Sequence, residues 1–155
     1  MAGGTTGSGE WPWRRPIEVS FRDLDVLGHV NHAVYLTWME NLRVGYFLNC
    51  APSGRLEEMT FVLAEAAARY LKPVRFGQSL RGETAPGRVG RSSFSLLYRF
   101  LDPGSGEVLA RGRTVQVMVE PGGYRSIPLT PELRSRLERD RVDPVSEGWE
   151  SPSQT

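Results

Sequence analysis

The sequence predicts an α+β domain in which an antiparallel sheet wraps around one long helix. Two observations favour this class. A long helical pattern of apolar residues lies early in the chain, and a run of strand-like segments separated by turn sequences follows it. The chain has 155 residues, of which 39% are hydrophobic and 24% charged, so a single globular domain is expected.

The first half of the chain predicts a strand, a helix and one ambiguous segment. A strand is expected over 16–25, where Ile17, Val19 and Phe21 alternate with polar residues. A helix is expected over 31–48, and because apolar residues surround most of it, we expect it to be buried. Asn31 is its best N-cap, with His32 next. The composition of residues 61–73 favours a helix, whereas the ends of this segment resemble a strand.

The second half is mostly strand. Alternating apolar residues predict strands over 94–101 and 108–119 and a shorter one over 124–127, with the turn sequences PGRVGR, DPGSGE and EPGG around them. A helix is expected over 131–141, with Thr130 as its cap and Pro131 at its first position. Residues 1–12 and 142–155 have the composition of disordered ends, which leaves 13–141 as the domain.

Charge and cysteine content narrow the function classes. The net charge of +1 gives no field that favours nucleic acid or an acidic membrane. Cys50 is the single cysteine, so an internal disulfide is excluded. The first residues lack the apolar core of a signal peptide, and no stretch is long and apolar enough to span a bilayer. We therefore expect a cytoplasmic protein without nucleic-acid or membrane partners.

The chemical signal is the contiguous segment 23–32, DLDVLGHVNH, between the first strand and the long helix. It places the carboxylate of Asp25 near a helix start, where backbone N–H groups lack partners within the helix. Those donors and the helix dipole suit a developing oxyanion. A nearby carboxylate can attack an acyl carbon or activate a water molecule. The pattern fits hydrolysis of an activated acyl group without a metal, so we expect no metal site.

This segment resembles the signature of hot-dog thioesterases of the 4-hydroxybenzoyl-CoA thioesterase type, D-x-D-x-x-G-H-V-N-N-x-x-Y followed by a helical Glu and Arg. The residues that match are Asp23, Asp25, Gly28, His29, Val30, Asn31, Tyr35, Glu40 and Arg43. The resemblance continues through Tyr70–Pro73 and covers roughly residues 14–140. It implies the hot-dog fold, with strand rather than helix over 64–70, and an active site at a dimer interface.

The resemblance also implies roles for individual residues. Asp25 corresponds to the catalytic aspartate, and the backbone N–H of about His32 to the donor that polarises the thioester carbonyl. Arg91 and, less strongly, Arg88 correspond to basic residues that meet the phosphates of coenzyme A. The catalytic candidates are therefore Asp25, His32 and Asn31, and the substrate-binding candidates are Arg91, Arg88 and Tyr35. Coenzyme A is part of the substrate, so no separate cofactor is expected.

The sequence departs from the family signature at two positions, and it leaves alternatives open for the activity. His32 stands where the signature has a second Asn, and Gln78 stands where an acidic residue is frequent. The expected activity is hydrolysis of an acyl-CoA by a homodimer or homotetramer, with Asp25 as nucleophile or general base. The alternatives are a thioesterase acting on acyl carrier protein and a hot-dog module that binds acyl-CoA without catalysis. A direct comparison of the two kinds of substrate distinguishes them.

Overall fold

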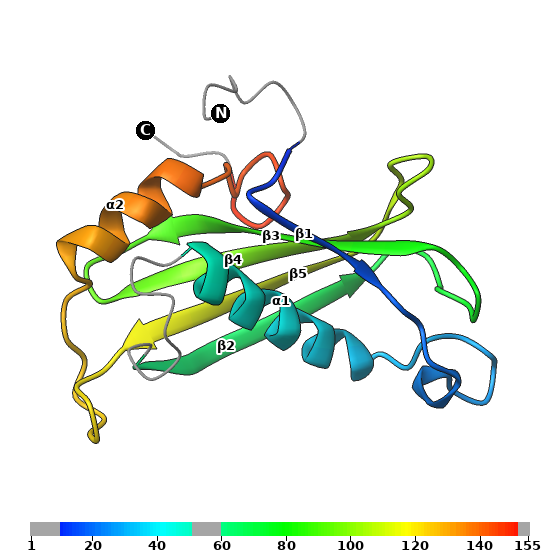
Figure 1. Ribbon diagram of the computed structural model, residues 1–155, viewed down its shortest axis with the longest axis horizontal. Coiled ribbons are helices and arrows are strands. Elements are labelled where there is room, and N and C mark those ends of the chain that lie inside the picture. Colours follow the sequence, from blue (N-terminus) through cyan, green and yellow to red (C-terminus); the bar gives the residue numbers. More distant parts are fainter. Residues whose placement is uncertain (1–9, 51–59, 152–155) are drawn as a thin grey trace.

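The computed structural model describes residues 10–50 and 60–151, which form a five-stranded antiparallel sheet and two α-helices (Figure 1). The strands follow the spatial order β1-β3-β4-β5-β2. Their bounds are Trp13–Ile17 for β1, Phe61–Tyr70 for β2, Leu80–Val89 for β3, Ser93–Leu101 for β4 and Val108–Met118 for β5. This architecture confirms the predicted α+β hot-dog fold.

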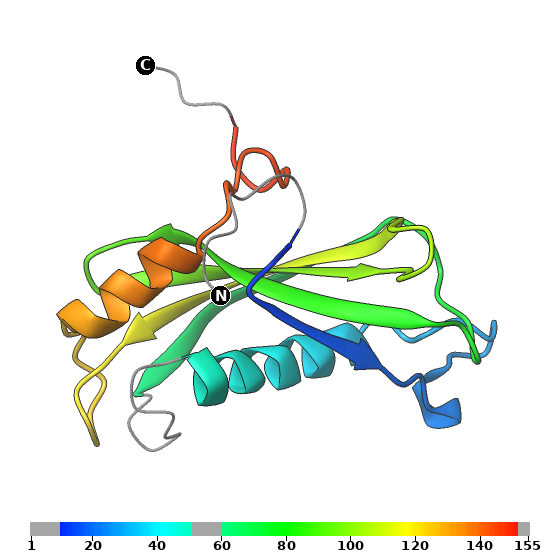
Figure 2. The same cartoon turned by 45° about the horizontal axis from the view of Figure 1, so that its top comes forward.

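The long helix α1 (Val34–Cys50) lies against one face of the sheet, as Figure 2 shows. Its buried side chains form one stripe, as the apolar periodicity predicts: Tyr35, Trp38, Met39, Leu42, Tyr46 and Phe47. Trp38 packs on Phe100 of β4 at 5.8 Å between ring centroids, and Phe47 packs on Phe94 at the same distance. The opposite side, which includes Leu36, is exposed, so the helix is half-buried rather than buried all round.

A glycine in β3 allows side chains of β1 and α1 to pack closely against it. A Cβ atom on Gly82 of β3 would lie 2.6 Å from Cδ1 of Ile17 and 2.8 Å from Cδ1 of Leu42. Real Cβ atoms do not approach so closely, so a larger residue would force the ends of these two side chains to move aside. Gly82 therefore leaves room for the side chains of Ile17 in β1 and Leu42 in the middle of α1.

Two strands run against local sequence preference. β2 has the alanine and glutamate content of a helix, yet it pairs antiparallel with β5 from Phe61 opposite Met118 to Tyr70 opposite Ala110. The ladder outweighs propensity, as the family resemblance implied. The sequence did not predict β3, because Gly82, Pro86 and Gly87 interrupt any strand pattern. The register of β3 with β4 shifts between Pro86 and Val89, where the ladder accommodates the proline.

Several predicted boundaries are wrong. The first strand begins at Trp13 and ends at Ile17; a 3-10 turn over Phe21–Asp23 follows, because the Asp23 carboxylate accepts the N–H of Ser20 at 2.9 Å. The predicted strand over 124–127 is only a single bridge between Val119 and Ser126. The last helix, α2 (Pro131–Asp140), is confirmed with Thr130 as its cap, whose Oγ1 accepts the N–H of Leu133 at 3.2 Å.

The predicted disordered tail is wrong over residues 142–151, which pack against the face of the sheet opposite α1 (Figure 2). Glu147 forms an ion pair with Arg111 of β5 at 2.5 Å, and the ring of Trp149 lies under the guanidinium of Arg69 at 4.1 Å. The N–H of Val142 donates to the carbonyl oxygen of Pro86 at 2.8 Å. Trp11, within the predicted disordered start, is also buried on this face. The remaining residues of both predicted ends, 1–9 and 152–155, lie outside the described residues.

Candidate active site

The segment between β1 and α1 folds into a short hairpin. Leu24 and Val30 face each other in an antiparallel bridge, and the N–H of Asn31 donates to the carbonyl oxygen of Asp23 at 2.8 Å. At the tip, the N–H of Asp25 donates to the carbonyl oxygen of His29 at 2.7 Å. Gly28 closes the turn with a φ of 77°, a conformation that glycine adopts without steric cost. The hairpin explains why the predicted site requires a glycine at this spacing.

The hairpin fixes the carboxylate of Asp25. Its Oδ1 accepts the backbone N–H groups of Leu27 at 2.9 Å and of His29 at 3.1 Å. Among the described residues, no hydrogen-bond donor reaches its Oδ2. One carboxylate oxygen is therefore held by the turn, and the other is available for a ligand.

The second arm of the hairpin is anchored in the core. The N–H of Val30 donates to the carbonyl oxygen of Val74 at 2.8 Å, and both side chains are buried. His29 forms an antiparallel bridge with Arg75. The loop that carries Asp25 is thus held by a segment that follows β2, and the orientation of the carboxylate is set by the fold as well as by the turn.

The start of α1 differs from the prediction. The helix begins at Val34, and Asn31 stabilises the turn before it rather than capping it: Asn31 Oδ1 accepts the N–H of Ala33 at 2.9 Å. The carbonyl oxygen of Asn31 accepts the N–H of Val34 at 3.0 Å. The other end of that peptide group is the N–H of His32, which has no acceptor in the part of the chain that the structure describes. A hydrogen bond to the carbonyl of a peptide group polarises its N–H, so this amide is a suitable oxyanion donor.

These groups line one pocket of about 290 Å³. Its lining contains three of the predicted site residues, Asp25, His32 and Tyr35, together with His29, Val30, Tyr70, Leu71, Lys72 and Pro73. Asn31 is outside the lining and acts through its turn. No sequence pattern pointed to Tyr70 or Lys72 as site residues, although the Tyr70–Pro73 segment belongs to the resemblance.

Aromatic side chains form one wall of this pocket. The ring of Tyr35 makes edge-on contacts with Trp38 at 5.0 Å, Tyr70 at 5.1 Å and Phe100 at 5.3 Å. Burial, with a smaller contribution from Tyr70, raises the pKa of Tyr35 to about 12. Tyr35 is therefore neutral at physiological pH and forms part of an aromatic wall rather than acting as a base.

The two predicted phosphate-binding arginines lie at the other end of the sheet. Arg88 and Arg91 flank the turn between β3 and β4, near the pair Phe94 and Gln116, whereas Tyr70 pairs with Ala110. The six steps of β5 between Gln116 and Ala110 span about 20 Å. Arg88 lines a separate hollow of about 200 Å³ with Glu65 and Arg113. Within one chain, the structure therefore does not bring Arg88 or Arg91 to Asp25.

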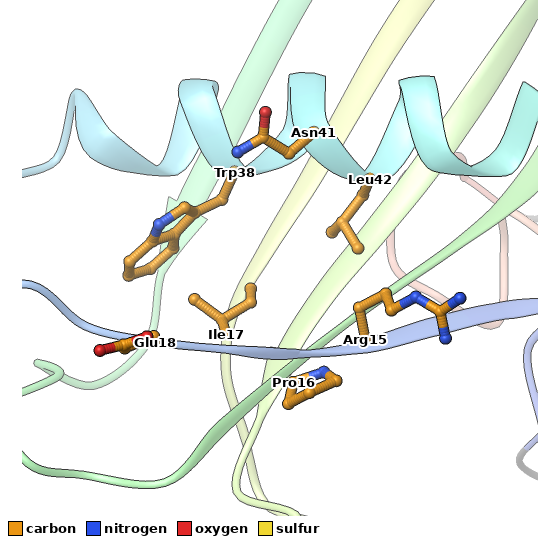
Figure 3. A pocket seen from close by; sticks show the side chains of 7 residues that line it. All are labelled: Arg15, Pro16, Ile17, Glu18, Trp38, Asn41 and Leu42. Atoms are coloured by element: carbon orange, nitrogen blue, oxygen red, sulfur yellow. The ribbon is translucent and has the colours of Figure 1, made fainter. Parts of the chain in front are cut away.

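A further hollow of about 220 Å³ lies between β1 and α1 (Figure 3). Its apolar side is formed by Ile17, Trp38 and Leu42, and Arg15, Glu18 and Asn41 line its polar side. Trp38 lines this hollow and packs against Tyr35, which lines the Asp25 pocket. The Asp25 pocket is the candidate site, because its lining includes a carboxylate and His32, whose amide has no acceptor among the described residues.

Two further features bear on the class of protein. Over residues 10–50 and 60–151, no group of three or more His, Cys, Asp and Glu side chains is arranged to hold a metal ion. In the same ranges, none of the helices has the length and apolar character needed to cross a membrane.

Comparison with known proteins places this geometry in a family. The chain resembles a thioesterase from Thermus thermophilus whose crystal structure contains coenzyme A and zinc. The two are 38% identical with a TM-score of 0.73, over 83% of this chain and 98% of that one. A predicted thioesterase from Bacillus stearothermophilus shares the fold, with a TM-score of 0.75 and 23% identity over 85% of this chain and 98% of that one.

The chain also matches a Bacillus subtilis protein and the model of a protein family. The uncharacterized protein YsmA of Bacillus subtilis (strain 168) is 26% identical over 121 residues, which cover 78% of this chain and 82% of YsmA. The model of the thioesterase-like superfamily matches residues 19–137, and the chain belongs to that family.

Proposed function

We propose that this protein hydrolyses acyl-CoA thioesters to a free acid and coenzyme A, with Asp25 as its working carboxylate. The observation that carries the proposal is one pocket that holds both an available carboxylate oxygen, Oδ2 of Asp25, and the residue with an unpartnered amide, His32. Family membership and the hot-dog fold support thioester hydrolysis in general. The coenzyme A in the Thermus relative supports the choice of an acyl-CoA substrate.

The proposed reaction follows from this arrangement. The thioester carbonyl oxygen accepts the N–H of His32, which stabilises the negative charge that develops on that oxygen. Oδ2 of Asp25 either attacks the carbonyl carbon or removes a proton from an attacking water molecule. Direct attack expels the thiolate of coenzyme A and leaves a mixed anhydride, which water then hydrolyses to regenerate the carboxylate. A thiolate leaves readily because a thiol has a pKa of about 8.5, so no general acid is required.

The proposed assembly is a homodimer or a tetramer built from such dimers. β2 lies at one edge of the sheet, and Val62, Leu63 and Tyr70 on it are exposed. A long unpaired edge with few charges favours pairing with a second strand. Light scattering tests this proposal: we expect a mass at least twice that of the 17.3 kDa chain.

The activity is tested with acetyl-, hexanoyl-, palmitoyl- and benzoyl-CoA, by detection of the released thiol. The same acyl groups on acyl carrier protein form the second arm of the experiment. Faster turnover of the coenzyme A esters supports the proposal. Faster turnover of the carrier-protein esters would show that the protein is a thioesterase acting on acyl carrier protein. Tight binding of an acyl-CoA without release of thiol would show a binding module instead.

A further inference from the structure

The side chain of Tyr70 connects the end of β2 to the start of α1. Its hydroxyl donates to the carbonyl oxygen of His32 at 2.8 Å, across 38 positions of sequence. Its ring meets the ring of His32 edge-on at 6.5 Å and that of Tyr35 at 5.1 Å. Tyr70 lines the same pocket as Asp25. The residue thus contacts the start of α1 at His32 and Tyr35 without belonging to the hairpin that carries Asp25.

The peptide groups on either side of His32 are held by hydrogen bonds. The N–H of Asn31 donates to Asp23, and its carbonyl oxygen accepts from Val34. The N–H of Ala33 donates to Asn31 Oδ1 at 2.9 Å. The carbonyl oxygen of His32 completes the set by accepting from Tyr70. Because the other contacts are local to the turn, the hydroxyl is the contact that holds this turn from the side of the sheet.

We propose that Tyr70 is a positioning residue that aims the His32 N–H at the thioester carbonyl. This inference rests on the proposed function and deepens it, because it names the group that keeps the oxyanion donor in place. A donor that rotates away from the developing charge loses the stabilisation that a fixed dipole gives. Burial raises the pKa of Tyr70 above its ordinary value, so the hydroxyl remains a donor throughout the pH range in which thioesters are assayed.

Tyr70→Phe removes the hydroxyl and keeps the ring that packs on Tyr35. Loss of a whole oxyanion donor costs about a hundredfold or more in kcat, so loss of its support is expected to lower kcat by about tenfold and to change KM by less than about twofold. The substrate is whichever of acetyl-, hexanoyl-, palmitoyl- and benzoyl-CoA the wild type hydrolyses fastest. Tyr124→Phe is the matched control, since Tyr124 is 91% exposed, and it is expected to keep wild-type kinetics.

A spectroscopic measurement separates positioning from stability. The same acyl-CoA, labelled with ¹³C at the carbonyl, is bound to the Asp25→Asn protein, and its carbonyl stretch is recorded by infrared difference spectroscopy. Polarisation by the His32 N–H moves that band to lower wavenumber than in free substrate, and Tyr70→Phe in the same background is expected to reverse most of the shift. The band comes from substrate bound to folded protein, so it remains informative even where the variant is less stable.

The outcomes distinguish this inference from the proposed function. The positioning role is wrong if Tyr70→Phe keeps the wild-type kcat. It is also wrong if kcat falls, with or without an equal change in KM, while the carbonyl band keeps the wavenumber that it has in Asp25→Asn alone. Either result leaves the proposed function standing. Absence of hydrolysis of all four thioesters by the wild type overturns both proposals. A reduced kcat, an unchanged KM and a reversed band shift support the inference.

Discussion

The backbone N–H of His29 donates to Oδ1 of Asp25 at 3.1 Å, so the residue that follows the glycine of the hairpin holds the carboxylate at its start. The N–H of Leu27 shares that oxygen at 2.9 Å. The carboxylate of Asp25 is therefore held directly by its own hairpin, whereas the turn that carries the proposed oxyanion donor also accepts a hydrogen bond from Tyr70 of β2. These two origins lead to different expected effects of mutation.

Asp25→Asn is expected to remove catalysis and preserve the fold. The amide oxygen of asparagine can accept the same two N–H groups, but it can neither attack a thioester nor take a proton from water. We expect kcat to fall by about a hundredfold or more, the scale for loss of a catalytic base, with substrate affinity near that of the wild type. Steady-state kinetics and the urea midpoint check this. A folded variant with wild-type turnover would falsify the proposed mechanism.

Arg91→Ala is expected to raise KM and leave kcat intact if Arg91 binds a phosphate of coenzyme A, because such binding is equal in ground and transition states. The effect is expected to disappear with an acyl-pantetheine substrate, which has no nucleotide. Arg139→Ala is the matched control, since Arg139 is exposed on α2. Equal losses on both substrates would show that Arg91 acts elsewhere.

The parts of the site that the sequence predicted are those that are contiguous in the chain. Asp25 and His32 belong to one segment, so local spacing was sufficient to place them near a helix start. Tyr70 reaches His32 only through the pairing of β2 with β5, which no local pattern encodes. The same reason explains the strand that the sequence did not predict. Gly82 and Pro86 interrupt the strand pattern of β3, whose strand conformation comes from pairing with its neighbours.

Tyr35 predicts a loss of stability at high pH. Its pKa in the folded state is about 12, above the ordinary 10.0, so the folded protein favours the protonated phenol. The contribution of Tyr35 to the free energy of unfolding is then fully present below pH 10.0 and is lost as the pH rises towards 12. The loss amounts to up to about 3 kcal/mol at ~1.4 kcal/mol per pKa unit. Urea unfolding between these pH values is expected to show a shallower decline in Tyr35→Phe. Tyr70 and Tyr98, whose pKa values are also raised by burial, account for a remaining slope. Identical declines in both proteins would contradict this assignment.

The segment 142–151 is expected to stabilise the fold through its contacts with arginines of the sheet. Glu147→Gln removes the partner of Arg111, whose side chain is 26% exposed, and we expect a loss of about 1 kcal/mol, below the cost of breaking a fully buried pair. Trp149→Ala removes the ring beneath Arg69 and contact with the apolar group around Trp11, with an expected loss of about 2 kcal/mol. Glu138→Gln is the control, because its ion pair with Arg134 on α2 is more exposed, and it is expected to change stability by less than about 0.5 kcal/mol. Urea unfolding measures all three.

Because none of these residues lines the Asp25 pocket, kcat is expected to stay at the wild-type value. If Glu147→Gln and Trp149→Ala both unfolded at the wild-type midpoint, the segment would not be bound to the sheet in solution.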